Sequence, residues 1–169
     1  MRFKNKRIMR SLAALVAVAA LAAGGASAQA AAATGTSERL VLCWYMVCFG
    51  NSVERYMQEI ELAQRHGIDG FLLDVGTWNA SPNYVTSSEL LYEAAKRLNS
   101  GFKLAMAPEC CVQPFGDVVA DVVERFKDHP NQLRHDGKIV LSGYGAANLF
   151  PQVLEKLKAD GVDVFLMPS

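Results

Sequence analysis

The stretch GIDGFLLDV (residues 67–75) joins the end of one helix to a strand that is apolar on both faces. Gly67 stands at the position just after a helix, where glycine commonly adopts a left-handed conformation. Ile68 to Val75 is then a nearly continuous apolar run, which is typical of a parallel strand buried between two layers. A helix, a short glycine turn and a buried strand in this order indicate an α/β fold.

The same alternation of helix and strand continues on both sides of residues 67–75. Apolar runs predict further strands at 40–47, 102–107, 138–142 and 162–167. Apolar residues at helical spacing predict four helices between these strands. Because a helix lies in each connection, the strands are expected to be parallel.

Polar residues supply the signals for helix starts. Asn51 and Thr86 are each followed three residues later by a glutamate, which is the pattern of a capping box. Asp117 and Asn148 mark the expected starts of the third and fourth helices. Asp136-Gly137 predicts a turn just before the fourth strand.

Two architectures fit five parallel strands joined by four helices. An open, doubly wound sheet could be complete at this length, whereas a (β/α)8 barrel needs about 250 residues. The loops after the strands are long and hold most of the aromatic, asparagine and acidic residues, which favours the barrel. No phosphate-binding glycine pattern follows the first strand, which counts against a nucleotide-binding open sheet. We therefore predict that residues 38–169 form a partial (β/α)8 barrel of the TIM type, truncated after about five strands and four helices.

The first 28 residues have the three parts of an export signal. Five basic residues and no acidic ones accompany a run of 13 small and apolar residues, Ser11 to Ala23, and Ala26-Ser27-Ala28 is a cleavage site of the A-x-A type. Such a run is too short to span a bilayer, which takes about 20 residues. This pattern predicts a signal peptide at 1–28, a disordered leader at 29–37, and a secreted or periplasmic protein without membrane association after cleavage.

Charge and cysteine usage narrow the classes of partner. Five of the 17 basic residues and none of the 17 acidic ones lie in the signal, so the mature chain has a net charge of −5 with neutral histidines. An acidic chain is poorly suited to nucleic acid or anionic membranes. The four cysteines, Cys43, Cys48, Cys110 and Cys111, allow three disulfide connectivities or remain free thiols, and their spacing matches no common zinc pattern. No metal and no cofactor is expected.

Two carboxylates are candidates for catalysis. Asp74 lies at the carboxyl end of the second strand, and Glu109 follows the third strand directly after Pro108. In a barrel both would face the same mouth from neighbouring strands, as the proton donor and the base or nucleophile of glycoside hydrolysis do. The alternative is that Asp74 only binds sugar hydroxyls and that Glu109 caps a loop or a helix. No Ser-His-Asp arrangement or nucleophile elbow is visible.

Aromatic residues gather at the same predicted rim, namely Trp44, Tyr45, Trp78, Tyr84 and Tyr144. Flat rings with a polar tip suit the C–H faces of sugar rings. Ordinary packing is the alternative for Trp44 and Tyr45, because both lie within the first strand. Trp78 lies in a long polar loop and is the stronger candidate for a sugar contact.

Three groups of short motifs carry a family resemblance. They are Tyr45-Met46-Val47 with Gly50-Asn51, residues 67–71, and His129-Pro130 with Asp136-Gly137-Lys138. In this order they resemble the first strand, the second strand and the approach to the fourth strand of glycoside hydrolase family 71, the α-1,3-glucanases or mutanases. The resemblance covers residues 40 to about 145. It implies a (β/α)8 barrel that hydrolyses α-1,3-linked glucan by inversion, with two carboxylates and no metal.

Asn51 lies in the first loop of that resemblance. It is counted with the aromatic residues Trp44, Tyr45, Trp78 and Tyr144 among those expected to bind substrate.

The chain also departs from that family. Trp44 stands where the family often has histidine, Asp74 stands where it often has asparagine, and Ala107-Pro108-Glu109 stands where an aspartate is expected. The family's catalytic acids lie in a Trp-Asn-Asp…Glu stretch on a later strand, and this sequence contains no such stretch. The resemblance therefore transfers no catalytic residue, and Asp74 and Glu109 remain inferences from position.

Three hypotheses about function follow. The first is an exported glycoside hydrolase of the family 71 type, acting on an α-glucan polysaccharide or oligosaccharide and present as a part that lacks the family's catalytic acids. The second is a carbohydrate-binding remnant without catalysis, and the third is a complete open-sheet α/β protein with another role. A truncated barrel would leave the first and fifth strands with unpaired edges, which predicts self-association.

Overall fold

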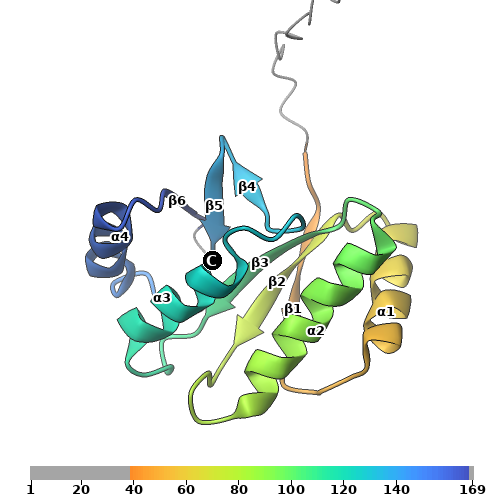
Figure 1. Ribbon diagram of the computed structural model, residues 1–169, viewed down its shortest axis with the longest axis horizontal. Coiled ribbons are helices and arrows are strands. Elements are labelled where there is room, and N and C mark those ends of the chain that lie inside the picture. Colours follow the sequence, from red (N-terminus) through yellow and green to blue (C-terminus); the bar gives the residue numbers. More distant parts are fainter. Residues whose placement is uncertain (1–38, 168–169) are drawn as a thin grey trace, which may run out of the picture. The chain divides into compact units, whose positions relative to one another are not determined.

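The structure is a computed structural model that describes residues 39–167, so the predicted signal peptide and leader lie outside the described residues. Strands and helices alternate along the chain (Figure 1). In chain order the elements are β1 (Leu42–Met46), α1 (Val53–Arg65), β2 (Gly70–Val75), α2 (Pro82–Leu98), β3 (Lys103–Pro108), α3 (Phe115–Phe126), β4 (Arg134–His135), β5 (Lys138–Leu141), α4 (Phe150–Ala159) and β6 (Val164–Leu166).

Five of these strands form the predicted parallel sheet. β1, β2, β3 and β5 lie side by side in this order, and β6 also pairs with β5. A helix connects each of these five strands to the next, so their carboxyl ends lie along one edge of the sheet. The predicted order of five strands and four helices is confirmed, and it is the architecture of a (β/α) barrel that is open along one side.

β4 was not predicted from the sequence. It is a two-residue strand that pairs antiparallel with β5. The predicted turn at Asp136-Gly137 connects the two strands, and both of its residues have positive φ angles, 49° and 77°. That conformation suits a tight hairpin, which explains why the turn is Asp-Gly. A strand of two residues has no period that a sequence pattern can reveal.

The first two helices begin at residues other than those predicted. Ser52, and not Asn51, is the N-cap of α1, and its hydroxyl accepts a hydrogen bond from the backbone N–H of Arg55 at 3.3 Å. α2 begins at Pro82, so Thr86 lies inside the helix and caps nothing. Proline is favoured at the first helical position because its φ is already helical and its missing N–H would have no partner there.

The other two helices also begin without the predicted cap. α3 starts two residues before Asp117, and the N-cap of α4 is Leu149, the residue after Asn148. The helix ends agree better with the sequence. Gly67 and Gly161 follow α1 and α4 with φ angles of 75° and 78°, which an L side chain would adopt only with strain.

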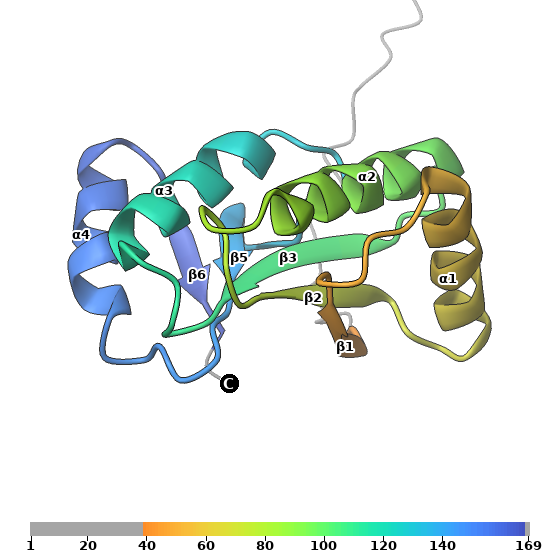
Figure 2. The same ribbon diagram turned by 90° about the horizontal axis from the view of Figure 1, so that it is seen from below.

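All four helices cover the same face of the sheet (Figure 2). Each turns an apolar stripe inward, and the strand residues that point toward the helices alternate with those that do not. The core between sheet and helices is large and includes Leu73, Leu104, Met106 and Leu141, all 0–1% exposed. This layer gives the described residues most of their buried apolar surface.

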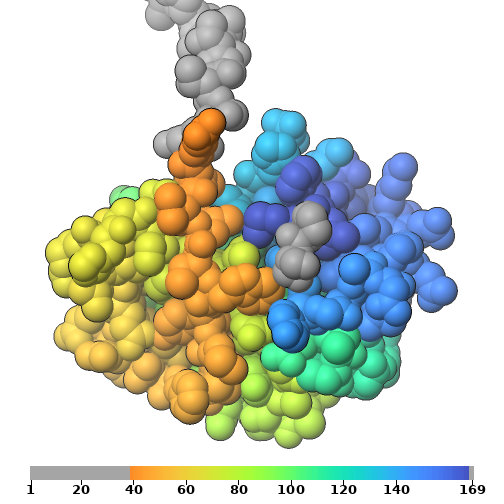
Figure 3. All heavy atoms as spheres, turned by 180° about the vertical axis from the view of Figure 1, so that it is seen from behind, coloured from red at the N-terminus to blue at the C-terminus, as the bar shows by residue number. Residues whose placement is uncertain are grey.

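The second face of the sheet carries a smaller core. Figure 3 shows the molecule from behind, with the orange residues that include β1 in front. Leu72, Ala105 and Val140 pack together there, with Leu42 and Met167 beside them. In a barrel this face is the interior. We call it the inner face. Within residues 39–167, no helix is long and apolar enough to cross a membrane.

Candidate functional site

Asp74 and Glu109 meet at the carboxyl ends of β2 and β3. Asp74 is opposite Ala107 in the parallel register, and the alternation of side chains places both on the inner face with Ala105. The backbone N–H of Glu109 donates to the carbonyl of Val75 at 3.0 Å, which extends the pairing past the end of β3. The structure therefore brings together the two carboxylates that the sequence singled out.

The environment of Asp74 favours its protonated form. Burial is the main cause, followed by the negative charge of Glu109 and a side-chain hydrogen bond between the two residues, and together they raise the pKa of Asp74 to about 6. The Oδ1 atom of Asp74 is buried and has no hydrogen-bond partner. Asp74 therefore keeps its proton up to about pH 6, well above the pH at which an ordinary aspartate loses it.

Gly76 and Tyr84 lie beside Glu109 in this acid pair. A Cβ atom on Gly76 would lie 3.0 Å from Oε1 of Glu109 and 3.1 Å from the hydroxyl oxygen of Tyr84, so a larger residue would require these side chains to shift by a few tenths of an ångström. Burial raises the pKa of Tyr84, and the charges of Cys48, Glu109 and Asp74 act in the same direction. From the sequence, Tyr84 was expected only as one of the aromatic residues at the rim. Its contact with the acid pair could not be predicted, because it depends on how the first turn of α2 is placed.

A free thiol also contacts the pair. The Sγ atom of Cys111 lies 3.2 Å from Oε2 of Glu109 and 3.0 Å from the carbonyl oxygen of Gly76. The hydrogen bond to Glu109 is the main cause of a raised pKa for the Cys111 thiol. All four cysteines are free thiols. In residues 39–167 no group of three or more His, Cys, Asp or Glu side chains is arranged to hold a metal ion.

Trp44 and Tyr144 form an aromatic pair across the inner face. Their ring centroids are 6.5 Å apart in a T-shaped arrangement, and their exposed fractions are 40% and 65%. Trp44 lies opposite Leu72 in the register. Met46 and Asp74 form the next pair on the inner face, toward the carboxyl ends of the strands. Trp44 is on β1 and Tyr144 follows β5, three strands away, so the sheet curls as a barrel does.

Tyr45 and Asn51, which the sequence also placed in the site, contact Glu59 of α1 instead. The hydroxyl of Tyr45 donates to Oε2 of Glu59, and the amide of Asn51 donates to Oε1 at 3.4 Å. The ring of Tyr45 stacks on Phe71 with centroids 4.6 Å apart. Neighbouring residues of a strand face opposite sides, so Trp44 on the inner face requires Tyr45 to face the helices.

The structure contradicts the expectation that Trp78 offers its ring to a sugar. Its side chain is only 2% exposed and belongs to the core between sheet and helices. The indole N–H donates to Oδ2 of Asp121 on α3 at 2.6 Å. The residues around Trp78 in the sequence are polar, so the sequence did not indicate that its ring is buried. Its hydrogen-bond partner, Asp121, lies 43 residues later in the chain.

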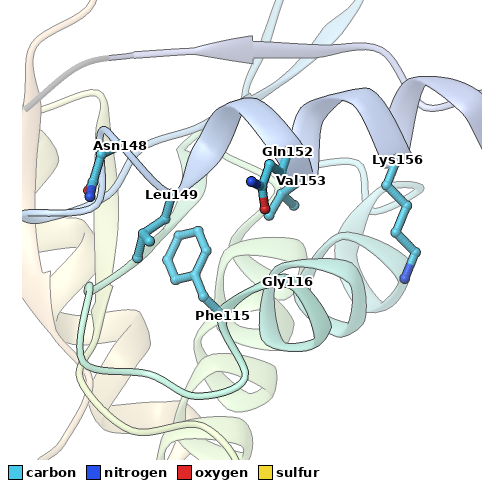
Figure 4. A pocket seen from close by; sticks show the side chains of 7 residues that line it. All are labelled: Phe115, Gly116, Asn148, Leu149, Gln152, Val153 and Lys156. Carbon is cyan, nitrogen blue, oxygen red and sulfur yellow. The ribbon is translucent and has the colours of Figure 1, made fainter.

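A pocket that does not include the acid pair lies between α3 and α4 (Figure 4). Its volume is about 300 Å³, and it is lined by Phe115, Gly116, Asn148, Leu149, Gln152, Val153 and Lys156. None of these side chains is a carboxylate, and the lining comes mainly from the facing sides of two helices. We therefore place the candidate site at the inner-face rim, around Asp74 and Glu109.

Comparison with known proteins gives a family and one related enzyme. The family model described as Glycosyl hydrolase family 71 matches residues 37–169. Glucan endo-1,3-alpha-glucosidase agn1 of Schizosaccharomyces pombe is 30% identical over 149 residues, which cover 79% of this chain and 34% of that protein. The chain thus spans about a third of the length of this relative.

Two solved structures are similar in fold. The endo-alpha-mannosidase of family GH99 from Bacteroides thetaiotaomicron, in complex with BIS-TRIS-propane, superposes with a TM-score of 0.58 at 16% identity, over 76% of this chain and 52% of that chain. Another structure of a GH99 endo-alpha-mannosidase from the same organism gives a TM-score of 0.53 at 15% identity, over 64% and 46% of the two chains. These are TIM-barrel enzymes, and the likeness supports the barrel architecture.

Proposed function

The chain belongs to glycosyl hydrolase family 71, and from this premise we propose that the inner-face rim around Asp74 and Glu109 binds an α-1,3-linked glucan. The related glucan endo-1,3-alpha-glucosidase supports this choice of polysaccharide. The observation that carries the proposal is the acid pair, because a protonated carboxyl beside a charged one is the arrangement that gives a proton to a sugar oxygen.

The geometry of the pair sets its part in hydrolysis. The two carboxyls of a glycosidase stand about 5–5.5 Å apart in retaining enzymes and about 6.5–9.5 Å apart in inverting ones, with the sugar between them. The charge of Glu109 and a side-chain hydrogen bond to it both raise the pKa of Asp74, so the two carboxyls interact directly, which differs from either arrangement. We therefore assign the pair a single role. Asp74 carries the proton, and the interaction with Glu109 raises the pKa of Asp74 so that the proton stays there. This replaces the sequence-based hypothesis of one acid and one separate base.

Trp44 and Tyr144 supply a surface for the sugar ring itself. Both are exposed on the inner face, and their perpendicular rings present one flat side and one edge. Aromatic faces pack well against the C–H groups of a pyranose, while the tyrosine hydroxyl stays available for a hydrogen bond. A glucan bound at this pair would extend along the rim toward Asp74.

A carbohydrate-binding role without catalysis is the second candidate. The observation that favours it is the contact between the two carboxyls, because the pair fills only one of the two roles that hydrolysis requires. Release of reducing sugar from α-1,3-glucan distinguishes the two candidates. Binding without release supports the second candidate, and release that is lost in Asp74→Asn supports the first.

We also propose that the protein acts outside the cytoplasm, after cleavage of residues 1–28. The basic head, the apolar run and the A-x-A site support this proposal. N-terminal sequencing of the protein recovered from the medium or periplasm should begin at Gln29. Recovery of protein that begins at Met1 from either compartment would contradict it.

Calorimetric titration with glucose oligosaccharides tests the proposed substrate. We expect α-1,3-linked oligosaccharides to bind, and α-1,4-linked and β-1,3-linked ones of the same length to bind more weakly. Tyr144→Ala should weaken binding several-fold, because a ring contact is worth about 0.5–1.5 kcal/mol beyond its buried area. Leu62→Ala, an exposed apolar residue on α1, is the matched control. Equal affinity for all linkages would contradict the proposal.

A further inference from the structure

Cys111 connects the two strand ends that carry the acid pair. Its Sγ atom lies 3.2 Å from Oε2 of Glu109, two residues earlier, and 3.0 Å from the carbonyl oxygen of Gly76, which directly follows β2. The residue as a whole is exposed, so burial in a core does not hold the thiol in place. The two polar contacts define its position.

The single proton of the thiol can go to only one of these two acceptors at a time. A charged carboxylate is the stronger acceptor, so the thiol donates to Glu109 whenever Glu109 is ionised. Asp74 differs, because its Oδ1 atom is buried and has no hydrogen-bond partner. The local contacts therefore stabilise negative charge on Glu109 and provide no donor for Oδ1 of Asp74.

We propose that Cys111 is a positioning residue whose thiol fixes the Glu109 carboxylate and makes it the charged member of the pair, which leaves the proton on Asp74. This inference rests on the proposed function for the part that the proton plays toward a sugar. The other groups that face the pair agree with it: Tyr84 reaches it from α2, and Cys48 adjoins Tyr84 from the loop after β1. Neither group carries a positive charge that would attract the negative charge to Asp74.

The first test follows the two carboxyls by carbon NMR in the full chain, with no sugar present. In the wild-type protein the titration step near pH 6 should appear mainly on Asp74. In Cys111→Ala the same step should be shared between the signals of Asp74 and Glu109. Cys111→Ser, whose hydroxyl can also donate, should restore the wild-type pattern. Identical curves for the wild type and Cys111→Ala would overturn the proposal.

The second test reads the contact from the thiol. Alkylation of Cys111 by iodoacetamide, followed by peptide mass spectrometry, should be several-fold faster in Glu109→Gln, because the thiolate no longer forms beside a negative charge. Cys43 is the internal control, since its thiol contacts the carbonyl of Trp44 and no carboxylate. An unchanged rate at Cys111 in Glu109→Gln would overturn the proposal.

These two tests separate the inference from the function on which it rests. Neither uses a sugar, so a failure to bind any glucan leaves their outcome intact. Conversely, glucan binding together with an unchanged titration in Cys111→Ala would keep the proposed function and remove Cys111 from it.

Discussion

Asp74 keeps its proton at a pH where a surface aspartate has lost it, and this affects stability. The pKa of Asp74 is about 6 in the folded chain and 3.8 as an ordinary carboxyl, so the folded state binds the proton more tightly. The contribution of this group to stability is complete below about pH 4 and is lost as the pH rises to about 6. Above that pH the loss is constant.

Asp74→Asn should remove this pH dependence. Relative to the wild type, the free energy of unfolding of the variant should rise between pH 4 and pH 6 by on the order of 1–2 kcal/mol, since one pKa unit is about 1.4 kcal/mol and the site is partly open to solvent. Urea unfolding at several pH values measures it. Asp69→Asn, at the opposite end of β2, is the control. Parallel curves for the wild type and Asp74→Asn would show that Asp74 titrates normally.

Trp78 should be a stability residue. Trp78→Ala removes a fully packed ring and leaves the carboxylate of Asp121 without its indole donor, so it should cost about 3–5 kcal/mol. Trp44→Ala, at an exposed ring, should cost far less. Thermal unfolding of the two variants provides the comparison, and a Trp78→Ala protein with wild-type stability would contradict the buried position.

At the level of single residues, sequence placed the carboxylates better than the aromatics. Asp74 and Glu109 follow from one rule, that parallel strands end at the same edge of a sheet. No such rule predicts that Trp78 is buried, because its burial depends on which elements pack over its loop. The sequence did not reveal the roles of Cys111 and Gly76. Both roles depend on contacts between residues that follow the ends of two different strands.

The start of α1 depends on Ser52. Its hydroxyl accepts from the N–H of Arg55, so Ser52→Ala should lower the free energy of unfolding by about 0.5–2 kcal/mol. Asn51→Ala should cost less, because Asn51 makes only a long contact of 3.4 Å to Glu59. Urea unfolding of both variants tests the order. A larger loss for Asn51→Ala would indicate that Asn51, and not Ser52, caps the helix.

Elements were predicted more accurately than their ends. Every parallel strand lies within its predicted apolar run to within one residue, because the strands carry apolar residues toward both the helices and the inner face. Helix starts were less accurate, because only α1 has a side-chain cap, from Ser52, and the N-cap residues of the other three helices make no side-chain hydrogen bond. Asn51 with Glu54 has the correct spacing for a capping box, but the helix begins one residue too late for it.

The described part of the molecule should associate with itself. β1 pairs only with β2, and β6 pairs only with β5, so each has an edge with unpaired backbone groups. The inner face also exposes Trp44 and Met46 to solvent. Light scattering after size exclusion should show dimers or larger species at micromolar concentration.

Met46→Lys should shift this equilibrium toward the monomer, because it places a charge on the inner face. Leu62→Lys is the matched control, since Leu62 is similarly exposed but lies on α1. A wild-type protein that stays monomeric at all concentrations would show that the inner face does not drive association.

The central claim is that a glucan binds at the inner-face rim, beside Trp44 and Asp74. The chain contains two tryptophans, and only Trp44 is exposed, which makes intrinsic fluorescence a local probe. We expect titration with an α-1,3-linked glucose oligosaccharide to change the emission of the wild type and of Trp78→Phe, and to leave Trp44→Phe unchanged. A response that persists in Trp44→Phe, or is absent from the folded wild-type protein, would contradict the proposed site.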